Sequence, residues 1–532
     1  MVRVVELLRQ GKTQELWEMG CGFLDLSLEA FMRLQHRMLL EQLELLKRCE
    51  LGRRVMDGTE PRSVEEFRER VPLTTYAEYA PYLLEQREDV LPERPLLWQR
   101  TSGRSGEYQF KWVPVTERVY REMGSAGLAM LLLSTCSGPG DVAIREHDKF
   151  LCGVAPRPYT SGTWGQRANE EGLLDFLPPF EEAERMSFEE RVRQGFELAL
   201  REGLDVFYGL SSVLVAIGEQ FSHHARGRSL RTAFSHPRVL ARLGKALLKS
   251  KLARRPLLPK DIWSLKGLVS AGIDASVYRE RIKGMWGCYP LHVYSTTESV
   301  LVALQTWDYD TMTFVPHFNL LEFIPEREHV KSRLSPGYQP ETVLLDEVRA
   351  GERYEMVVTN FLGGPFVRYR LGDIIEITSL RNQRLNINLP QMVFHARVDD
   401  VIDIAGFTRL TEKVIWQAIE NSGVAYEGWT VRKETGEGPV LRLYLEVKEN
   451  GHRSAAELTS IIHEELKRLD PDYADLESML GLKPLQVTLL PEGAFRQYVS
   501  RQRASGAELV HLNPPHLNPP DTVLHSLVMR SA

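Results

Sequence analysis

The chain has 532 residues, of which 43% are hydrophobic and 26% charged, proportions typical of globular proteins. Its 66 basic and 72 acidic residues give a formal net charge of -6, which excludes a generic nucleic-acid-binding protein, because such proteins carry a positive excess. The five cysteines form no C-x-x-C pair, which disfavours a disulfide framework and a zinc site. The N-terminus is too charged for a signal peptide, and no apolar run is long enough for a transmembrane helix. We therefore expect a cytoplasmic protein.

Helical and strand-like patterns alternate over most of the chain. Residues 1–58 carry apolar side chains at helical spacing, and Pro61 closes this region. From about 95 to 395, short apolar runs mix with helical stretches. One example is the capping box of Ser187 and Glu190, whose helix ends at Gly203 before a strand-like run at 204–209. This alternation predicts an α/β domain with mixed sheets and helices.

The pattern changes after about residue 400. Leucine and valine at 441, 443, 445 and 447 alternate with polar residues, which predicts a strand with one buried face. Ser454 and Glu457 form a capping box, and 485–490 is a second strand-like run. The repeated L-N-P-P at 512–520 predicts an extended surface segment. We expect a large N-terminal domain over 1–398, helical over 1–60, and a small, mobile α/β domain over 399–532 with a Pro-rich tail.

Four polar segments between these patterns are candidates for chemistry. The first is Thr101-Ser-Gly-Arg-Ser-Gly106, followed by Lys111. A tight loop of small residues exposes N–H groups that cradle phosphate oxygens, and hydroxyl groups and a lysine add donors and charge. The second is Tyr294-Ser-Thr-Thr-Glu298 at a strand end, where hydroxyls suit phosphate and Glu298 suits Mg²⁺. The alternative for the first segment is an ordinary Ser/Gly turn, and the alternative for the second is a polar turn at the end of a strand.

The third and fourth segments suit a ribose. Tyr369-Arg-Leu-Gly-Asp373 ends in a carboxylate that can accept two hydroxyl hydrogen bonds from a ribose diol. The fourth runs from His395 to Gly406 at the change of pattern, where Arg397 can reach ribose or phosphate and residues 399–400 can form a hinge. His395 is a weaker site candidate. The alternative for the third segment is a hairpin turn with a surface aspartate, and the alternative for the fourth is a linker with ordinary ion pairs.

The order and spacing of these segments resemble the adenylate-forming acyl-activating superfamily, which includes acyl-CoA synthetases and luciferase. Within it, three features resemble the acyl-acid amido synthetases, the auxin- and jasmonate-conjugating family of plants with bacterial relatives. They are the T-S-G-R-S-G loop with K-W-V-P, the block Y-S-T-T-E, and V-V-T-N-F at 357–361 before Y-R-L-G-D. The resemblance covers about residues 70–510.

The resemblance implies an ATP- and Mg²⁺-dependent ligase that activates a carboxylic acid as an acyl-adenylate and passes the acyl group to an amine. Lys111, Glu298 and Arg104 would be catalytic, with Glu298 also holding the metal. Residues of all four segments would contact the nucleotide, and Gly272 and Ile273, outside these segments, would flank the adenine. The residues of the four segments are Ser102, Gly103, Arg104, Ser105, Gly106, Tyr294, Thr296, Thr297, Asp373 and Arg397. Two alternatives stay open: an acid–thiol ligase that makes a CoA or carrier-protein thioester, and a non-catalytic protein that binds a nucleotide or acyl-adenylate.

The sequence departs from the family pattern at three places. Arg104 stands where threonine is usual in the family and would add a phosphate contact, and residues 107–110 lengthen the loop before Lys111. The C-terminal domain lacks the family's P-x-x-x-x-G-K segment. The role of the lysine in that segment would then fall to Arg496, Arg501 or Arg503, or to Lys111 alone.

A basic stretch remains outside these motifs. Residues 226–255 contain no Asp or Glu. A helix after Pro237 would carry Arg238, Arg242, Lys245 and Lys249 on one face, a basic amphipathic pattern. An anionic membrane surface, an acidic carrier protein, an anionic cosubstrate and a plain solvated helix face are all compatible with it.

Overall fold

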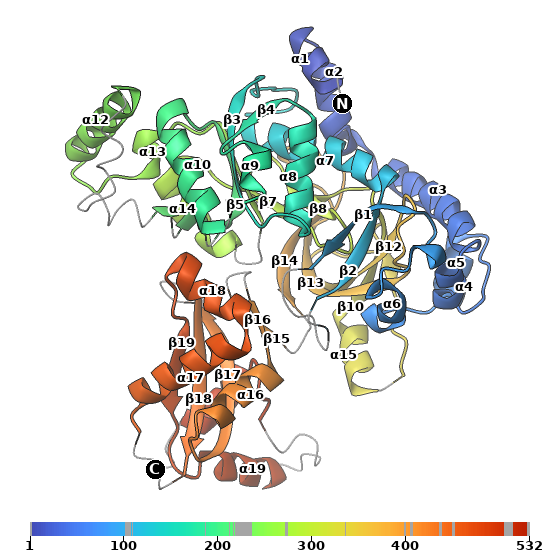
Figure 1. Ribbon diagram of the computed structural model, residues 1–532. Helices are drawn as coiled ribbons and strands as arrows, with labels where there is room; N and C mark the ends of the chain where they lie inside the picture. The colour runs from blue at the N-terminus through green and yellow to red at the C-terminus, as the bar shows by residue number, and fades with distance from the viewer. Residues whose placement is uncertain are drawn as a thin grey trace. The chain divides into compact units, whose positions relative to one another are not determined.

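The computed structural model describes residues 3–101, 108, 110–186, 188–211, 213–215, 217–218, 237–271, 275–335, 337–397, 401–404, 408–435, 439–448, 453–504 and 514–528. The chain divides into two compact units, a large unit of Met1–Thr101 with Lys111–Val398 and a small unit built on Asp399–Ala532. Figure 1 labels the elements of both. Within the described ranges, no helix has both the length and the apolar character that spanning a membrane requires.

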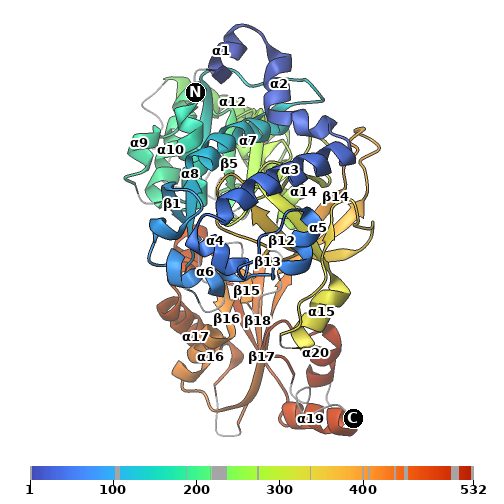
Figure 2. The same cartoon turned by 90° about the vertical axis from the view of Figure 1, so that its right-hand side faces the viewer.

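The large unit begins with helices. They are α1 (Arg3–Arg9), α2 (Thr13–Cys21), α3 (Leu28–Leu46), α4 (Glu50–Val55), α5 (Val64–Arg70) and α6 (Tyr76–Leu83). Ser27 caps α3, because its hydroxyl accepts the Ala30 N–H. The buried face of α3 packs on strand β10 (Asn319–Pro325), where the Gln35 amide donates to the Asn319 carbonyl. Figure 2 shows α3 together with α4, α5 and α6.

A twelve-stranded mixed sheet forms the centre of the large unit, in the order β11-β10-β12-β13-β14-β9-β8-β7-β6-β5-β3-β4. Strands β3 to β7 pair in parallel, whereas the pairs from β7 to β8 and onward to β11 are antiparallel. The parallel strands are β3 (Asp148–Gly153), β4 (Leu174–Phe176), β5 (Val206–Leu210), β6 (Gly267–Ala271) and β7 (Leu291–Tyr294). The others are β8 (Ala303–Gln305), β9 (Met312–Phe314), β10, β11 (Val343–Leu344), β12 (Arg353–Asn360), β13 (Tyr369–Ser379) and β14 (Gln391–Arg397). The predicted α/β class with mixed sheets is confirmed.

Helices accompany the parallel half of this sheet (Figure 1). They are α7 (Glu117–Thr135), α8 (Thr160–Glu170), α9 (Phe180–Ala183), α10 (Phe188–Glu202), α12 (Pro237–Leu252), α13 (Pro259–Ile262) and α14 (Ala275–Trp286). Aromatic rings fill the space between helix and sheet. Trp286 stacks on Trp263 with 6.5 Å between ring centroids and meets Phe207 of β5 edge-on at 5.3 Å. A hairpin of β1 (Pro95–Arg100) and β2 (Trp112–Thr116) and the helix α15 (Glu326–Leu334) complete the unit.

The small unit is also α/β. Its strands are β15 (Val401–Ile404), β16 (Thr408–Thr411), β17 (Tyr426–Thr435), β18 (Pro439–Val447) and β19 (Leu485–Leu489), and its helices are α16 (Glu412–Asn421), α17 (Ala455–Leu469), α18 (Pro471–Leu480), α19 (Ala494–Ala504) and α20 (Asp521–Val528). The predicted strand is present as β18, but the prediction that it has one buried face is wrong. Tyr444 and Glu446 are also buried, because Tyr444 packs with residues of α19 and α20 and Glu446 accepts the N–H groups of Gly493 and Phe495.

The Pro-rich tail pairs with the edge strand β17. The Val431 N–H donates to the His516 carbonyl at 2.7 Å, and the Asn518 N–H donates to the Val431 carbonyl at 2.8 Å. The His516 ring stacks on Trp429 with 4.3 Å between centroids. The tail is extended around residue 517, as predicted, but it covers a sheet edge that would otherwise expose unpaired backbone groups.

Candidate functional site

The candidate site begins where the last parallel strand, β7, ends at Tyr294. In open α/β sheets, ligands bind beyond the carboxyl ends of the strands. A turn follows in which the Thr296 hydroxyl accepts the Ser299 N–H at 3.0 Å. The end of β12 supports this turn, because the Asn360 amide donates to the Glu298 carbonyl at 3.0 Å. The same amide donates to the Asn319 side chain, which donates in turn to the Ser299 carbonyl.

Lys111, Glu298 and Tyr369 form a buried polar cluster. The Lys111 Nζ lies 3.0 Å from Glu298 Oε1 and 2.9 Å from Tyr369 Oη, and the Tyr369 hydroxyl donates to the same carboxylate oxygen at 3.3 Å. The Lys111 and Glu298 side chains are 10% and 9% exposed. The ammonium group also lies 5.3 Å from the centroid of the Tyr76 ring, within cation–π range. Three segments far apart in the sequence thus meet at one charge pair.

The Tyr369 phenol stays neutral in this cluster. Burial raises its pKa well above the ordinary value, and the neighbouring Glu298 carboxylate raises it further. A neutral phenol both donates and accepts, so Tyr369 orients the carboxylate and the lysine without adding a charge.

A second contact joins the same two segments. The Tyr294 hydroxyl donates to Asp373 Oδ2 at 2.8 Å, and both side chains are buried. Two hydrogen bonds therefore join the end of β7 and the turn after it to strand β13: Tyr369 with Glu298, and Tyr294 with Asp373. Gly372 before the aspartate has a φ of 71°, a conformation that favours glycine. This backbone conformation and the hydrogen bond from Tyr294 together hold the Asp373 carboxylate in position.

The remaining predicted residues lie around these contacts. Asp373 stands opposite Arg397 in the pairing of β13 with β14. The Thr297 hydroxyl accepts from the Thr160 hydroxyl at the start of α8, at 2.8 Å. His395 is exposed on β14.

Part of the predicted site lies outside the described residues. This applies to Ser102, Gly103, Arg104, Ser105, Gly106, Gly272 and Ile273, and to the side chain of Arg397. The ends of the first segment are described. The Thr101 N–H donates to the Lys111 carbonyl and the Lys111 N–H donates to the Thr101 hydroxyl, both at 3.0 Å. The segment therefore starts and ends beside the lysine of the buried cluster.

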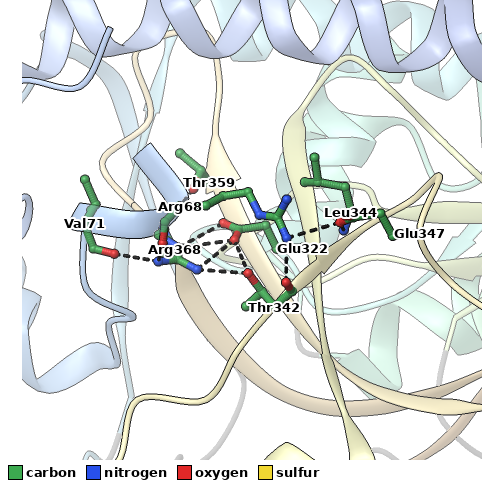
Figure 3. Close-up of polar contacts among 8 residues, drawn as sticks. All are labelled: Arg68, Val71, Glu322, Thr342, Leu344, Glu347, Thr359 and Arg368. Atoms are coloured by element: carbon green, nitrogen blue, oxygen red, sulfur yellow. Dashed lines mark hydrogen bonds and ion pairs between the residues drawn. The ribbon is translucent and has the colours of Figure 1, made fainter. Parts of the chain in front are cut away.

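Arg368 holds the start of strand β13 in place (Figure 3). Its guanidinium donates to the Glu322 carboxylate at 2.9 Å, to the carbonyls of Arg68 and Val71, and to the Thr342 hydroxyl. The side chains of Arg368 and Glu322 are 6% and 0% exposed. Since Tyr369 follows directly in the chain, this buried ion pair positions the phenol of the cluster.

Glu298 offers one carboxylate for a metal ion. Within the described part of the chain, three potential metal-ligating side chains gather only at His463, Glu464 and Glu477 of the small unit, where Lys467 and Lys483 pair with Glu477. Mg²⁺ is commonly held by one or two carboxylates together with water and substrate phosphates. The residues at Glu298 therefore fit an ion that arrives with a nucleotide rather than one held by the protein alone.

Sequence reasoning did not assign a role to Tyr369, Asn360 or Asn319. Tyr369 belongs to the Y-R-L-G-D motif and Asn360 to the V-V-T-N-F motif, so the motifs marked these positions without indicating what the side chains contact. Arg501, a candidate replacement for the family lysine, lies on α19 and donates to the Ser526 hydroxyl at 3.2 Å. Arg496 lies on the same helix.

Comparisons with known proteins match three parts of the chain to one family. Residues 22–151 match the GH3 family N-terminal domain, 312–397 the central domain and 411–518 the C-terminal domain, together more than half of the chain. Over 290 residues the chain is 24% identical to the jasmonoyl–L-amino acid synthetase GH3.5 of Oryza sativa subsp. japonica, covering 52% of this chain and 44% of that relative. The alignment thus spans less than half of the relative's length.

Two solved structures share the fold. The AtGH3.15 acyl acid amido synthetase in complex with 2,4-DB has a TM-score of 0.54 at 16% identity, covering 97% of this chain and 95% of that one. A 2-hydroxyisobutyryl-CoA ligase in complex with 2-HIB-AMP and CoA has a TM-score of 0.52 at 16% identity, covering 84% and 85%. At these identities the likeness establishes the fold alone.

Proposed function

The chain belongs to the GH3 family, as its motifs predicted, and on that premise we propose that it is a ligase that converts a carboxylic acid and an amine into an amide at the cost of ATP. The observation that carries the proposal is the buried cluster of Lys111, Glu298 and Tyr369, cross-linked to Tyr294 and Asp373. It brings a cation, two carboxylates and two phenols from separate motifs to the end of a parallel strand.

In the proposed first step, a carboxylate oxygen of the acid attacks the α-phosphorus of ATP. The bond from that phosphorus to the bridging oxygen breaks, and pyrophosphate leaves with the electron pair. The positive charge of Lys111 offsets the negative charge that develops on the phosphate oxygens, and its low exposure strengthens the effect. Mg²⁺ bound with ATP beside Glu298 would neutralise further phosphate charge.

The other residues of the proposed site position the nucleotide. We assign the phosphates to Ser102, Gly103, Arg104, Ser105 and Gly106 with Thr296 and Thr297, the adenine to Gly272 and Ile273, and the ribose to Asp373 and Arg397. The Tyr294 hydroxyl, which donates to Asp373, orients that carboxylate.

In the proposed second step, an uncharged amine attacks the carbonyl carbon of the acyl-adenylate, loses a proton and expels AMP. The relative from Oryza sativa is named a jasmonoyl–L-amino acid synthetase, and we propose an amino acid as the acceptor here. The small unit, hinged near residues 399–400, would separate the two steps. Five free cysteines support the cytoplasm as the location.

One experiment separates this function from its alternatives. A panel of aromatic, aliphatic and fatty acids is incubated with ATP, with amino acids and CoA in competition, and the products are identified by mass spectrometry. Amide and AMP formation supports the proposal. A CoA thioester identifies an acid–thiol ligase, and ATP binding by calorimetry without AMP formation identifies a non-catalytic nucleotide-binding protein.

A further inference from the structure

Helix α12 (Pro237–Leu252) exposes an apolar face. Its buried side consists of Val239, Leu243, Ala246 and Ser250. The opposite side carries four leucines, Leu240, Leu247, Leu248 and Leu252, which are 43%, 45%, 61% and 76% exposed. At the α-helical rotation per residue these leucines occupy an arc of about 140°. Figure 1 shows α12 at an edge of the large unit, beside α13 and α10.

Cations accompany these leucines. Arg238, Lys245 and Lys249 border the leucine arc on one side, Lys251 lies within it, and all four are exposed. Among the residues that the structure describes, none of the four has an ion-pair partner. The sequence contains no Asp or Glu from 221 to 260, although the whole chain has a net charge of -6. The positive charge is therefore local to this helix.

Two further basic residues of this stretch have roles inside the large unit. Arg242, expected on the exposed basic face, is half-buried and donates to the carbonyls of Ala199 and Leu200 near the end of α10. Arg255 pairs with Asp261 through two contacts of 2.7 Å. The protein thus uses part of the stretch to fix α12 and leaves the remaining cations and leucines facing outward.

We propose that α12 docks the protein on a membrane surface that contains anionic phospholipid. An interfacial helix places leucines at the boundary of the acyl chains and keeps its Lys and Arg groups at the level of the headgroups. Lys251 can extend its ammonium to that level along its own apolar stem. A helix that binds a protein groove uses a narrow stripe of anchors spaced three to four residues apart, whereas the leucine arc here is wide.

The test measures binding of the full chain to phosphatidylcholine vesicles with and without phosphatidylglycerol, by flotation. The double variants Lys245→Glu/Lys249→Glu and Leu248→Ser/Leu252→Ser alter only exposed positions of α12. Arg33→Glu/Arg37→Glu on α3 is the matched control, because these side chains are 67% and 69% exposed and the change in net charge is the same. Thermal unfolding and amide formation, unchanged in all variants, verify that each one folds.

We expect the wild-type chain to bind the anionic vesicles and not the neutral ones. Each α12 variant should weaken binding about tenfold or more, because both the charge and the apolar contact contribute, while the control binds like the wild type. Absence of wild-type binding, full binding by the leucine variant, or equal weakening in the control would overturn the proposal. So would binding to an acidic acyl carrier protein in the absence of vesicle binding, which would identify a protein partner instead.

Discussion

Replacing Glu298 by glutamine tests the charge pair at the centre of the candidate site. The carboxylate lies 3.0 Å from the Lys111 ammonium, and both side chains are about nine-tenths buried. Removing one partner of a buried ion pair costs about 3–5 kcal/mol, because the other charge remains desolvated. The glutamine oxygen can still accept a hydrogen bond from the lysine, so we expect a loss of about 3 kcal/mol in the free energy of unfolding.

The double variant Lys111→Met/Glu298→Gln separates stability from chemistry. It removes both charges, so its loss of stability should be smaller than the sum of the two single losses by about 1–3 kcal/mol. Activity should not recover. Each single variant should lower acid-dependent ATP–pyrophosphate exchange about 10²-fold, equivalent to about 2.7 kcal/mol of transition-state stabilisation, and the double variant should be no more active.

The assays are urea unfolding followed by tryptophan fluorescence and exchange of labelled pyrophosphate into ATP. Near-normal exchange in Glu298→Gln would refute the assignment of this residue to the site. Recovery of both stability and exchange in the double variant would refute it as well, because the pair would then serve only the fold.

Three further predictions concern residues around the cluster. Tyr294→Phe removes the hydrogen bond to Asp373 and should raise the KM for ATP about three- to tenfold, with a smaller change in kcat, as measured by steady-state kinetics; an unchanged KM would contradict this. Arg368→Met leaves the Glu322 carboxylate buried without its partner and should lower the free energy of unfolding by about 3–5 kcal/mol in urea, of which a second change, Glu322→Gln, should restore part. Burial lowers the pKa of His292 from 6.5 to about 4, so the unfolded chain binds the proton first; stability is complete above about pH 6.5 and falls as the pH drops toward 4. His292→Gln should make this fall shallower, and an equally steep fall would exclude His292 as its cause.

Local signals predicted individual elements of the fold. The capping box of Ser454 and Glu457 is present at the start of α17, since each side chain satisfies the other's backbone N–H. Such a signal lies within four residues and does not depend on the rest of the fold. The second buried face of β18 was not predictable in this way, because α19 and α20, which cover Tyr444, lie about fifty residues or more further along the chain. The order of the twelve strands likewise depends on pairing between distant segments.

The motifs located the segments of the site but not their contacts. Sequence reasoning selected Lys111, Glu298, Tyr294 and Asp373 by the chemistry of their side chains. It could not pair Glu298 with Tyr369 or Tyr294 with Asp373, because these partners meet only when β7 and β13 lie in one sheet. Asn360 gave no chemical signal, since an asparagine that supports a turn by hydrogen bonding to a backbone carbonyl looks like any polar residue in the sequence.

The transfer of oxygen from the acid to AMP tests the proposed chemistry most directly. An acid that supports exchange is labelled with ¹⁸O in its carboxyl group and incubated with ATP, an amino acid and the protein. If the carboxylate attacks the α-phosphorus, the AMP released with the amide carries one ¹⁸O atom and the pyrophosphate carries none. Unlabelled AMP, or label in orthophosphate released together with ADP, would contradict an acyl-adenylate intermediate.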